Sequence, residues 1–72
     1  MHEIRAQIAA NVWQVIAELG TMVAEGDDIA ILESMKMEIP VTTPVPGVVR
    51  ELHVEPSQQV AEGDLIALID ES

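Results

Sequence analysis

The strongest candidate for chemistry in this sequence is the segment Glu33-Ser34-Met35-Lys36-Met37-Glu38. Lys36 is the only lysine in the chain, although an acidic protein could use further lysines for solubility. It lies between two methionines, which an ordinary solvated turn rarely exposes. The nearby acids favour its charged ammonium form, so Lys36 should be a poor nucleophile by itself. We therefore expect Lys36 to be a substrate, acylated by an enzyme that supplies its own base and activated acyl group. The plain alternative is a solvated turn with a lysine for solubility.

The other residues that could do chemistry do not form a recognisable site. His2 and His53 are far apart in the sequence. The pair Asp27-Asp28 lacks the alternating oxygen ligands and the glycine of a calcium loop. No base or orienting residue accompanies the three serines, Ser34, Ser57 and Ser72. The sequence predicts no catalytic residue and no metal site, so the protein is expected not to be an enzyme.

The charge balance excludes several classes of partner. Thirteen acids against three bases give a formal net charge of −10. Such a surface repels nucleic acid and anionic membranes. The chain has no cysteine, no apolar run long enough to span a membrane and no signal peptide at its N-terminus. These features predict a cytoplasmic protein.

An internal repeat organises the chain. The segment Val23–Asp27 recurs as Val60–Asp64, an offset of 60 − 23 = 37 positions. At the same offset Ile29-Ala30 matches Ile66-Ala67, so the repeat covers roughly residues 12–34 and 49–71. Two copies are too few for a solenoid. Residues 1–72 are therefore predicted to form one domain with internal pseudo-symmetry.

Each half of the repeat has the pattern of short strands separated by turns. The two Glu-Gly-Asp segments, 25–27 and 62–64, are typical turn sequences. The apolar runs 29–32 and 65–69 have the length of strands buried on both faces. The first run leads into Lys36 and places it at a hairpin tip. Because the tip lacks the Asn-Gly or Gly-Gly that a two-residue turn prefers, backbone strain is expected there.

One segment has a competing helical pattern. Between residues 4 and 19 the apolar side chains lie near helical spacing, in an alanine-rich stretch that ends at Gly20. The repeat favours strands instead, because Val12–Glu18 is the partner of Val49–Glu55. In that partner, the alternation of apolar and polar residues before Pro56 disfavours a helix.

The lysine segment resembles the attachment motif of biotinyl domains, which is usually Glu-Ala-Met-Lys-Met and whose modified lysine corresponds to Lys36. The resemblance also includes the Glu-Gly-Asp turns and the Pro44-x-x-Gly47-Val48-Val49 that opens the second half. The chain has the size of stand-alone biotin/lipoyl attachment proteins. Two departures are Ser34, where alanine is usual, and the first half, which has Gln7 and Ala10 in place of Pro-x-x-Gly.

The resemblance implies an all-β barrel-sandwich hybrid, a flattened barrel of two pseudo-symmetric antiparallel sheets with Lys36 on a hairpin tip. It implies covalent biotin on Lys36, attached by a biotin protein ligase that recognises the flanking residues Glu33, Ser34, Met35, Met37 and Glu38. The domain would then carry carboxyl groups between a biotin carboxylase and a carboxyltransferase, as in an acyl-CoA carboxylase.

Two other functions fit the same fold. A lipoyl carrier would bear lipoate on Lys36, but lipoyl domains usually have Asp-Lys-Ala at the tip, so Met-Lys-Met favours biotin. An unmodified protein-binding module would use Met35 and Met37 as an adaptable apolar contact patch.

Overall fold

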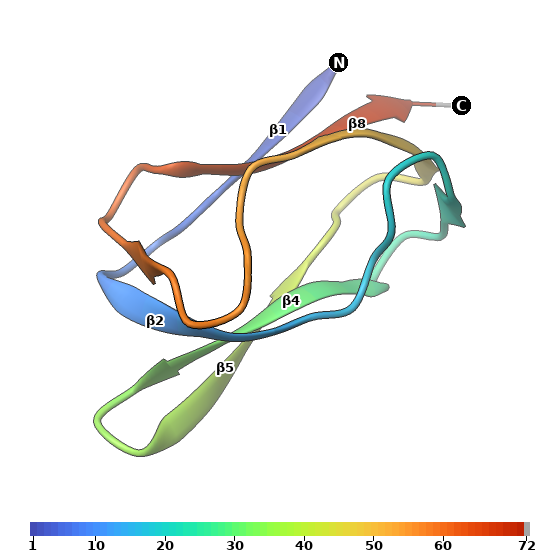
Figure 1. The fold of residues 1–72 in the computed structure, drawn as a ribbon. Helices are drawn as coiled ribbons and strands as arrows, with labels where there is room; N and C mark the ends of the chain where they lie inside the picture. Colours follow the sequence, from blue (N-terminus) through green and yellow to red (C-terminus); the bar gives the residue numbers. More distant parts are fainter. Residues whose placement is uncertain (72) are drawn as a thin grey trace.

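The computed structural model describes residues 1–71, and these residues form strands and connecting turns without a helix (Figure 1). The predicted all-β class is confirmed. The eight strands are β1 (His2–Arg5), β2 (Ala10–Val15), β3 (Met22–Val23), β4 (Asp28–Ser34), β5 (Met37–Thr42), β6 (Gly47–Leu52), β7 (Gln59–Val60) and β8 (Leu65–Glu71).

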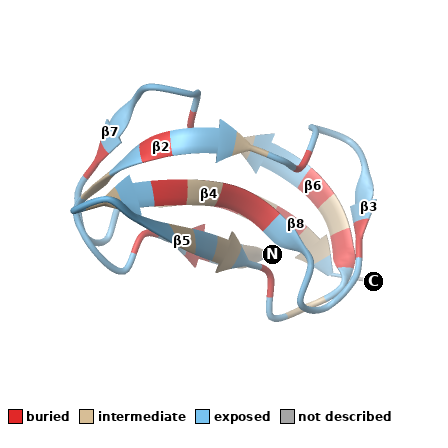
Figure 2. Cartoon of the chain, turned by 90° about the horizontal axis from the view of Figure 1, so that it is seen from below, coloured by how far each residue is buried: buried red, intermediate tan, exposed pale blue. Residues whose placement is uncertain are grey.

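The strands form two four-stranded antiparallel sheets that pack face to face. One sheet has the order β1-β8-β6-β3 and the other the order β5-β4-β2-β7. Buried residues occur along the strands of both sheets (Figure 2), and the largest fully buried apolar ones are Ile29, Leu32, Ile66, Ile69, Val12 and Val49. The molecule is elongated, with extents of 35 × 17 × 17 Å. This is the predicted barrel-sandwich hybrid.

The two sheets are equivalent at the 37-residue offset. Adding 37 to the residues of β2 gives β6, and adding 37 to those of β4 gives β8. The connections repeat as well: Gly26 N donates to Thr43 O at 2.7 Å, and Gly63 N donates to Ala6 O at 2.8 Å. The strands of the two halves are mixed, because β3 from the first half pairs with β6 from the second.

The helical alternative for residues 4–19 is wrong, and the predicted strands are present. The segment forms β1 and β2 with a turn between them. A helix would place the whole apolar stripe on one buried face. Instead Ile4 and Val12 are buried, whereas Ile8 and Ile16 are 40% and 42% exposed.

The expectation that the two apolar runs are buried on both faces is wrong. Ile31 in β4 and Leu68 in β8 are only partly buried and do not pack against the core. A register shift between Asp28 and Ala30 explains how the adjacent residues Ile29 and Ala30 can both be buried. Each run therefore contributes to one buried face. The first run leaves Ile31 only partly buried and outside the core, and the second leaves Leu65 and Leu68 so.

Candidate functional site

Met35 and Lys36 form the two-residue turn that joins β4 to β5. Ser34 is paired with Met37 across the base of this turn. The backbone φ angles of Met35 and Lys36 are 52° and 66°. Positive φ at both central positions is the geometry of a type I′ hairpin turn, which normally selects Asn-Gly. The strain expected at the tip is present, at a cost of about 1 kcal/mol or more for each residue.

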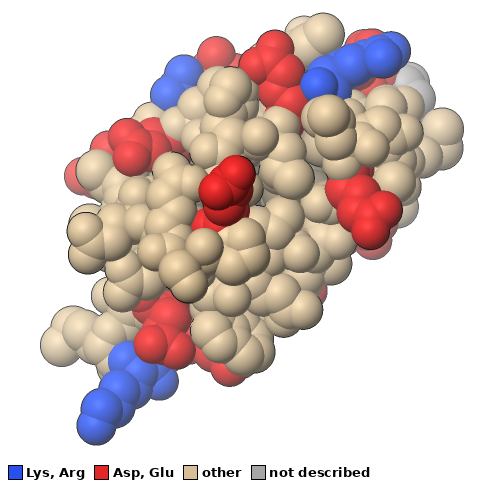
Figure 3. Space-filling view, viewed as in Figure 1, with Lys and Arg blue, Asp and Glu red and all other residues tan. Residues whose placement is uncertain are grey.

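The turn exposes the side chains that the sequence singles out. Met35 is 92% exposed and Met37 is 65% exposed, and Lys36 is exposed between them. Within residues 1–71, Lys36 takes part in no ion pair. A basic side chain projects from the end of the molecule at which Figure 1 places the hairpin (Figure 3). The amine is therefore accessible to another protein.

The hairpin brings the remaining predicted site residues close to the lysine. Glu33 and Glu38 lie directly opposite each other on β4 and β5, and both are exposed. Like charges in such a pair disfavour the hairpin slightly. Ser34 is half-buried at the base of the turn. The six residues from Glu33 to Glu38 thus lie on one short hairpin. The two carboxylates form the strand pair that follows Ser34–Met37, away from the tip.

The weaker candidates are dispersed over the rest of the chain. His53 Nε2 lies 2.7 Å from Glu51 Oε1, and His2 Nδ1 lies 3.9 Å from Glu71 Oε1. Asp27 stabilises the turn in which it lies, because its Oδ2 accepts a hydrogen bond from Ala24 N at 2.8 Å. No group of three or more potential metal ligands occurs among residues 1–71. Ser72 lies outside the described residues.

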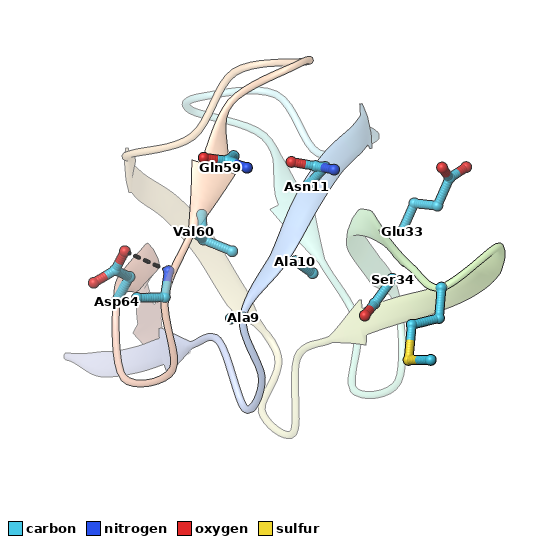
Figure 4. Close-up of a pocket in the computed structure, with 10 residues that line it drawn as sticks. Ala9, Ala10, Asn11, Glu33, Ser34, Gln59, Val60 and Asp64 are labelled. Carbon is cyan, nitrogen blue, oxygen red and sulfur yellow. Dashed lines mark hydrogen bonds between the residues drawn. The ribbon is translucent and has the colours of Figure 1, made fainter.

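A shallow groove beside the hairpin was not anticipated from the sequence. One wall comes from the end of β4, and the opposite wall comes from β7 and the turn after it (Figure 4). Its floor is the start of β2, where Ala9 and Ala10 leave room because their side chains are small. The sequence feature that coincides with the floor of the groove is this pair of adjacent small residues.

A family model described as "Biotin-requiring enzyme", the biotin/lipoyl family, matches residues 3–69. The match includes the hairpin and both halves of the repeat. The chain belongs to the biotin/lipoyl attachment family. The description of the matching family model names biotin as the required group, and the exposed amine of Lys36 has the chemistry needed to hold biotin as an amide.

Two small relatives of this biotin/lipoyl domain match nearly end to end. The "Biotinylated protein TB7.3 homolog" of Mycobacterium leprae is 43% identical over 67 residues, which cover 93% of this chain and 94% of the relative. The "Biotin/lipoyl attachment protein" of Bacillus subtilis is 38% identical over 69 residues, which cover 96% and 94%.

A solved structure shows the same fold within a much larger enzyme. A single-chain, multi-domain long-chain acyl-CoA carboxylase matches with a TM-score of 0.92 and 30% identity, over 99% of this chain. The biotin/lipoyl domain spans only 7% of that chain. No helix in the described part of our structure is long and apolar enough to cross a membrane.

Proposed function

We propose that this chain is a biotin carrier module whose Lys36 is biotinylated by a biotin protein ligase. The observation that carries the proposal is the strained two-residue turn that holds Lys36 outward between two exposed methionines. A type I′ turn of Asn-Gly would form at lower cost, so the fold alone does not favour Met35-Lys36. Strain retained at an exposed tip is typical of a functional site.

The attachment reaction needs only one group from this chain. The Lys36 Nζ, after giving up a proton to a base of the ligase, would attack the carbonyl of an activated biotinyl adenylate. An amide bond forms and AMP leaves. In this reaction Glu33, Ser34, Met35, Met37 and Glu38 would serve as the surface that the ligase recognises. The module itself contributes no catalytic residue.

Once attached, biotin supplies a carrier for carboxyl groups. We propose that the module moves between a biotin carboxylase and a carboxyltransferase of the acyl-CoA carboxylase type, in the cytoplasm. Because a long flexible arm tethers biotin to a compact body, its encounter with the second partner enzyme is effectively intramolecular, with effective concentrations of order mM. The match to a long-chain acyl-CoA carboxylase supports this assignment.

Intact mass of the purified protein tests the proposal. Co-expression with an active ligase and biotin should add one biotin to the parent protein and none to Lys36→Arg, which keeps the charge but cannot form the amide. Loss of one positive charge should also move the protein toward the anode, since 2 − 13 gives a net charge of −11 in place of −10.

Two outcomes would overturn the biotin assignment. A lipoyl adduct on Lys36 in the native host would make the chain a lipoyl carrier, an alternative supported by the name of the Bacillus subtilis relative. No adduct at all, with Lys36→Arg indistinguishable from the parent, would favour an unmodified protein-binding module.

A further inference from the structure

The outer face of the lysine-bearing sheet has an apolar centre. Gln14 of β2, Ile31 of β4 and Pro40 of β5 lie in one cross-strand row. The register of β2 shifts between Val12 and Gln14, so Trp13 is the extra residue of a bulge and lies beside Gln14 opposite Ile31. We name Trp13, Ile31 and Pro40 the outer apolar patch. Trp13 is 50% exposed, Pro40 is exposed, and Ile31 does not pack against the core.

The sister sheet shows that the fold does not require this patch. Its strand β6 has the same bulge, with a register shift between Val49 and Glu51. At the 37-residue offset the patch positions are occupied by Arg50, Leu68 and Glu3. Arg50 Nε donates to Asp70 Oδ2 at 2.9 Å, so that face is charged and internally paired. The same backbone position accepts arginine in one sheet and tryptophan in the other.

Two acidic residues separate the outer apolar patch from the tip of the hairpin. Glu33 and Glu38 form the next outward-facing pair toward the tip, between the patch and Lys36. Glu33 is the counterpart of Asp70, yet neither Glu33 nor Glu38 forms an ion pair within the described chain. The face therefore presents an indole, then two carboxylates without counter-ions, then the lysine. A partner that binds the tip would contact the lysine first, then the two carboxylates and then the indole.

We propose that this face is the docking surface for the enzyme that acylates Lys36. The partner surface would have an apolar socket for Trp13, bordered by lysine or arginine side chains that meet Glu33 and Glu38. Tryptophan is enriched among residues that dominate binding energy, and opposite charges around it guide the encounter. This inference rests on the proposed function and extends the contact surface from the attachment motif to Trp13, Ile31 and Pro40.

Substitutions copied from the sister sheet test the docking surface in the intact chain. Trp13→Arg and Pro40→Glu place residues that the equivalent strands already carry, so both variants should fold, as thermal unfolding by circular dichroism will verify. We expect Trp13→Arg to raise the KM of a biotin protein ligase for the carrier about tenfold with little change in kcat. Pro40→Glu should act in the same direction. Arg50→Gln, on the sister face, is the matched control and should leave KM unchanged.

Because Trp13 is the only aromatic residue, one spectroscopic signal reports on the face directly. The carrier labelled with 5-fluorotryptophan and bearing Lys36→Arg, which prevents turnover, should give a single fluorine resonance that shifts or broadens as ligase is added. An unchanged KM in Trp13→Arg together with an unmoved resonance at saturating ligase would overturn the docking surface alone. A resonance that moves with carrier concentration, without ligase, would indicate a second copy on this face and would also overturn it. Failure of the parent protein to gain biotin would instead overturn the proposed function, and this inference with it.

Discussion

Gly20 and Ser57 occupy equivalent positions in the two halves, and each hydrogen bonds to a valine of the other half. Gly20 N donates to Val49 O at 2.8 Å, and Ser57 N donates to Val12 O at 2.8 Å. Their φ angles are 85° and 72°. The same left-handed turn is thus made once by glycine, which accepts positive φ freely, and once by serine, which does not.

Exchanging these two residue types should change stability in opposite directions. Ser57→Gly should raise the free energy of unfolding by about 1 kcal/mol, and Gly20→Ser should lower it by a similar amount. For a domain of this size, 1 kcal/mol corresponds to a shift of about 5 °C in the unfolding midpoint. Calorimetry on the two variants checks this. Shifts of the same sign would contradict it.

In the Met35-Lys36 turn, a substitution that increases stability should abolish the proposed function. Lys36→Gly removes the cost of positive φ at that position, so we expect a gain of about 1 kcal/mol together with complete loss of the biotin adduct. Lys36→Ala is the control, since it also loses the adduct but retains the strained backbone. Urea unfolding compares the two variants, and equal stabilities would show that the turn is not strained at Lys36.

Gly47 and Gly63 are required for different reasons, and substitution of each by alanine can distinguish the two reasons. A Cβ on Gly47 would overlap Asp70 O and lie 2.9 Å from Ile69 Cγ2, so the adjacent strand β8 would have to move. A Cβ on Gly63 would meet nothing within 4 Å, but its φ is 90°. We expect Gly63→Ala to cost about 1 kcal/mol, and Gly47→Ala to cost about 3 kcal/mol or more because overpacking adds strain. Denaturant unfolding with the reverse order would refute this interpretation.

Thr43 is the one buried polar side chain among the described residues. Its Oγ1 donates to Val45 O at 2.6 Å and accepts from Val45 N at 3.3 Å. Thr43→Val keeps the shape and removes both bonds, which should cost about 1–2 kcal/mol. The neighbouring exposed Thr42→Val is the control and should be nearly neutral. Equal midpoints for the two variants would show that the hydroxyl of Thr43 does not stabilise the fold.

Much of the fold could be predicted because the repeat shows where turns and strands recur. The predicted turns at Asp27 and Asp64 are present, and in each the carboxylate accepts a hydrogen bond from the backbone N–H three residues earlier. The strand assignment of β2 also came from its repeat partner, against a helical spacing that favoured another structure. The hairpin tip was placed correctly because an apolar run and a proline-containing strand flank Lys36.

Other features depend on strand partners, which side-chain alternation does not specify. The bulges at Trp13 and Arg50 arise from the register against β4 and β8, so their outward direction could not be read from the sequence. The outward positions of Ile31 and Leu68 were missed for the same reason. The mixing of the two halves within each sheet is a long-range pairing, and nothing in either half alone indicates it.

The pairing of β1 with β8 repeats the pairing of β5 with β4, residue for residue: His2 opposite Ile69 corresponds to Ile39 opposite Leu32. The body of the molecule therefore has two poles of the same architecture (Figure 1), and only one of them is closed by a turn. A circular permutant that joins β8 to β1 through a second Met-Lys turn would display an acceptor amine at both poles. If Lys36 is the attachment site, a few side chains around one turn, and not the scaffold, determine which pole accepts the modification.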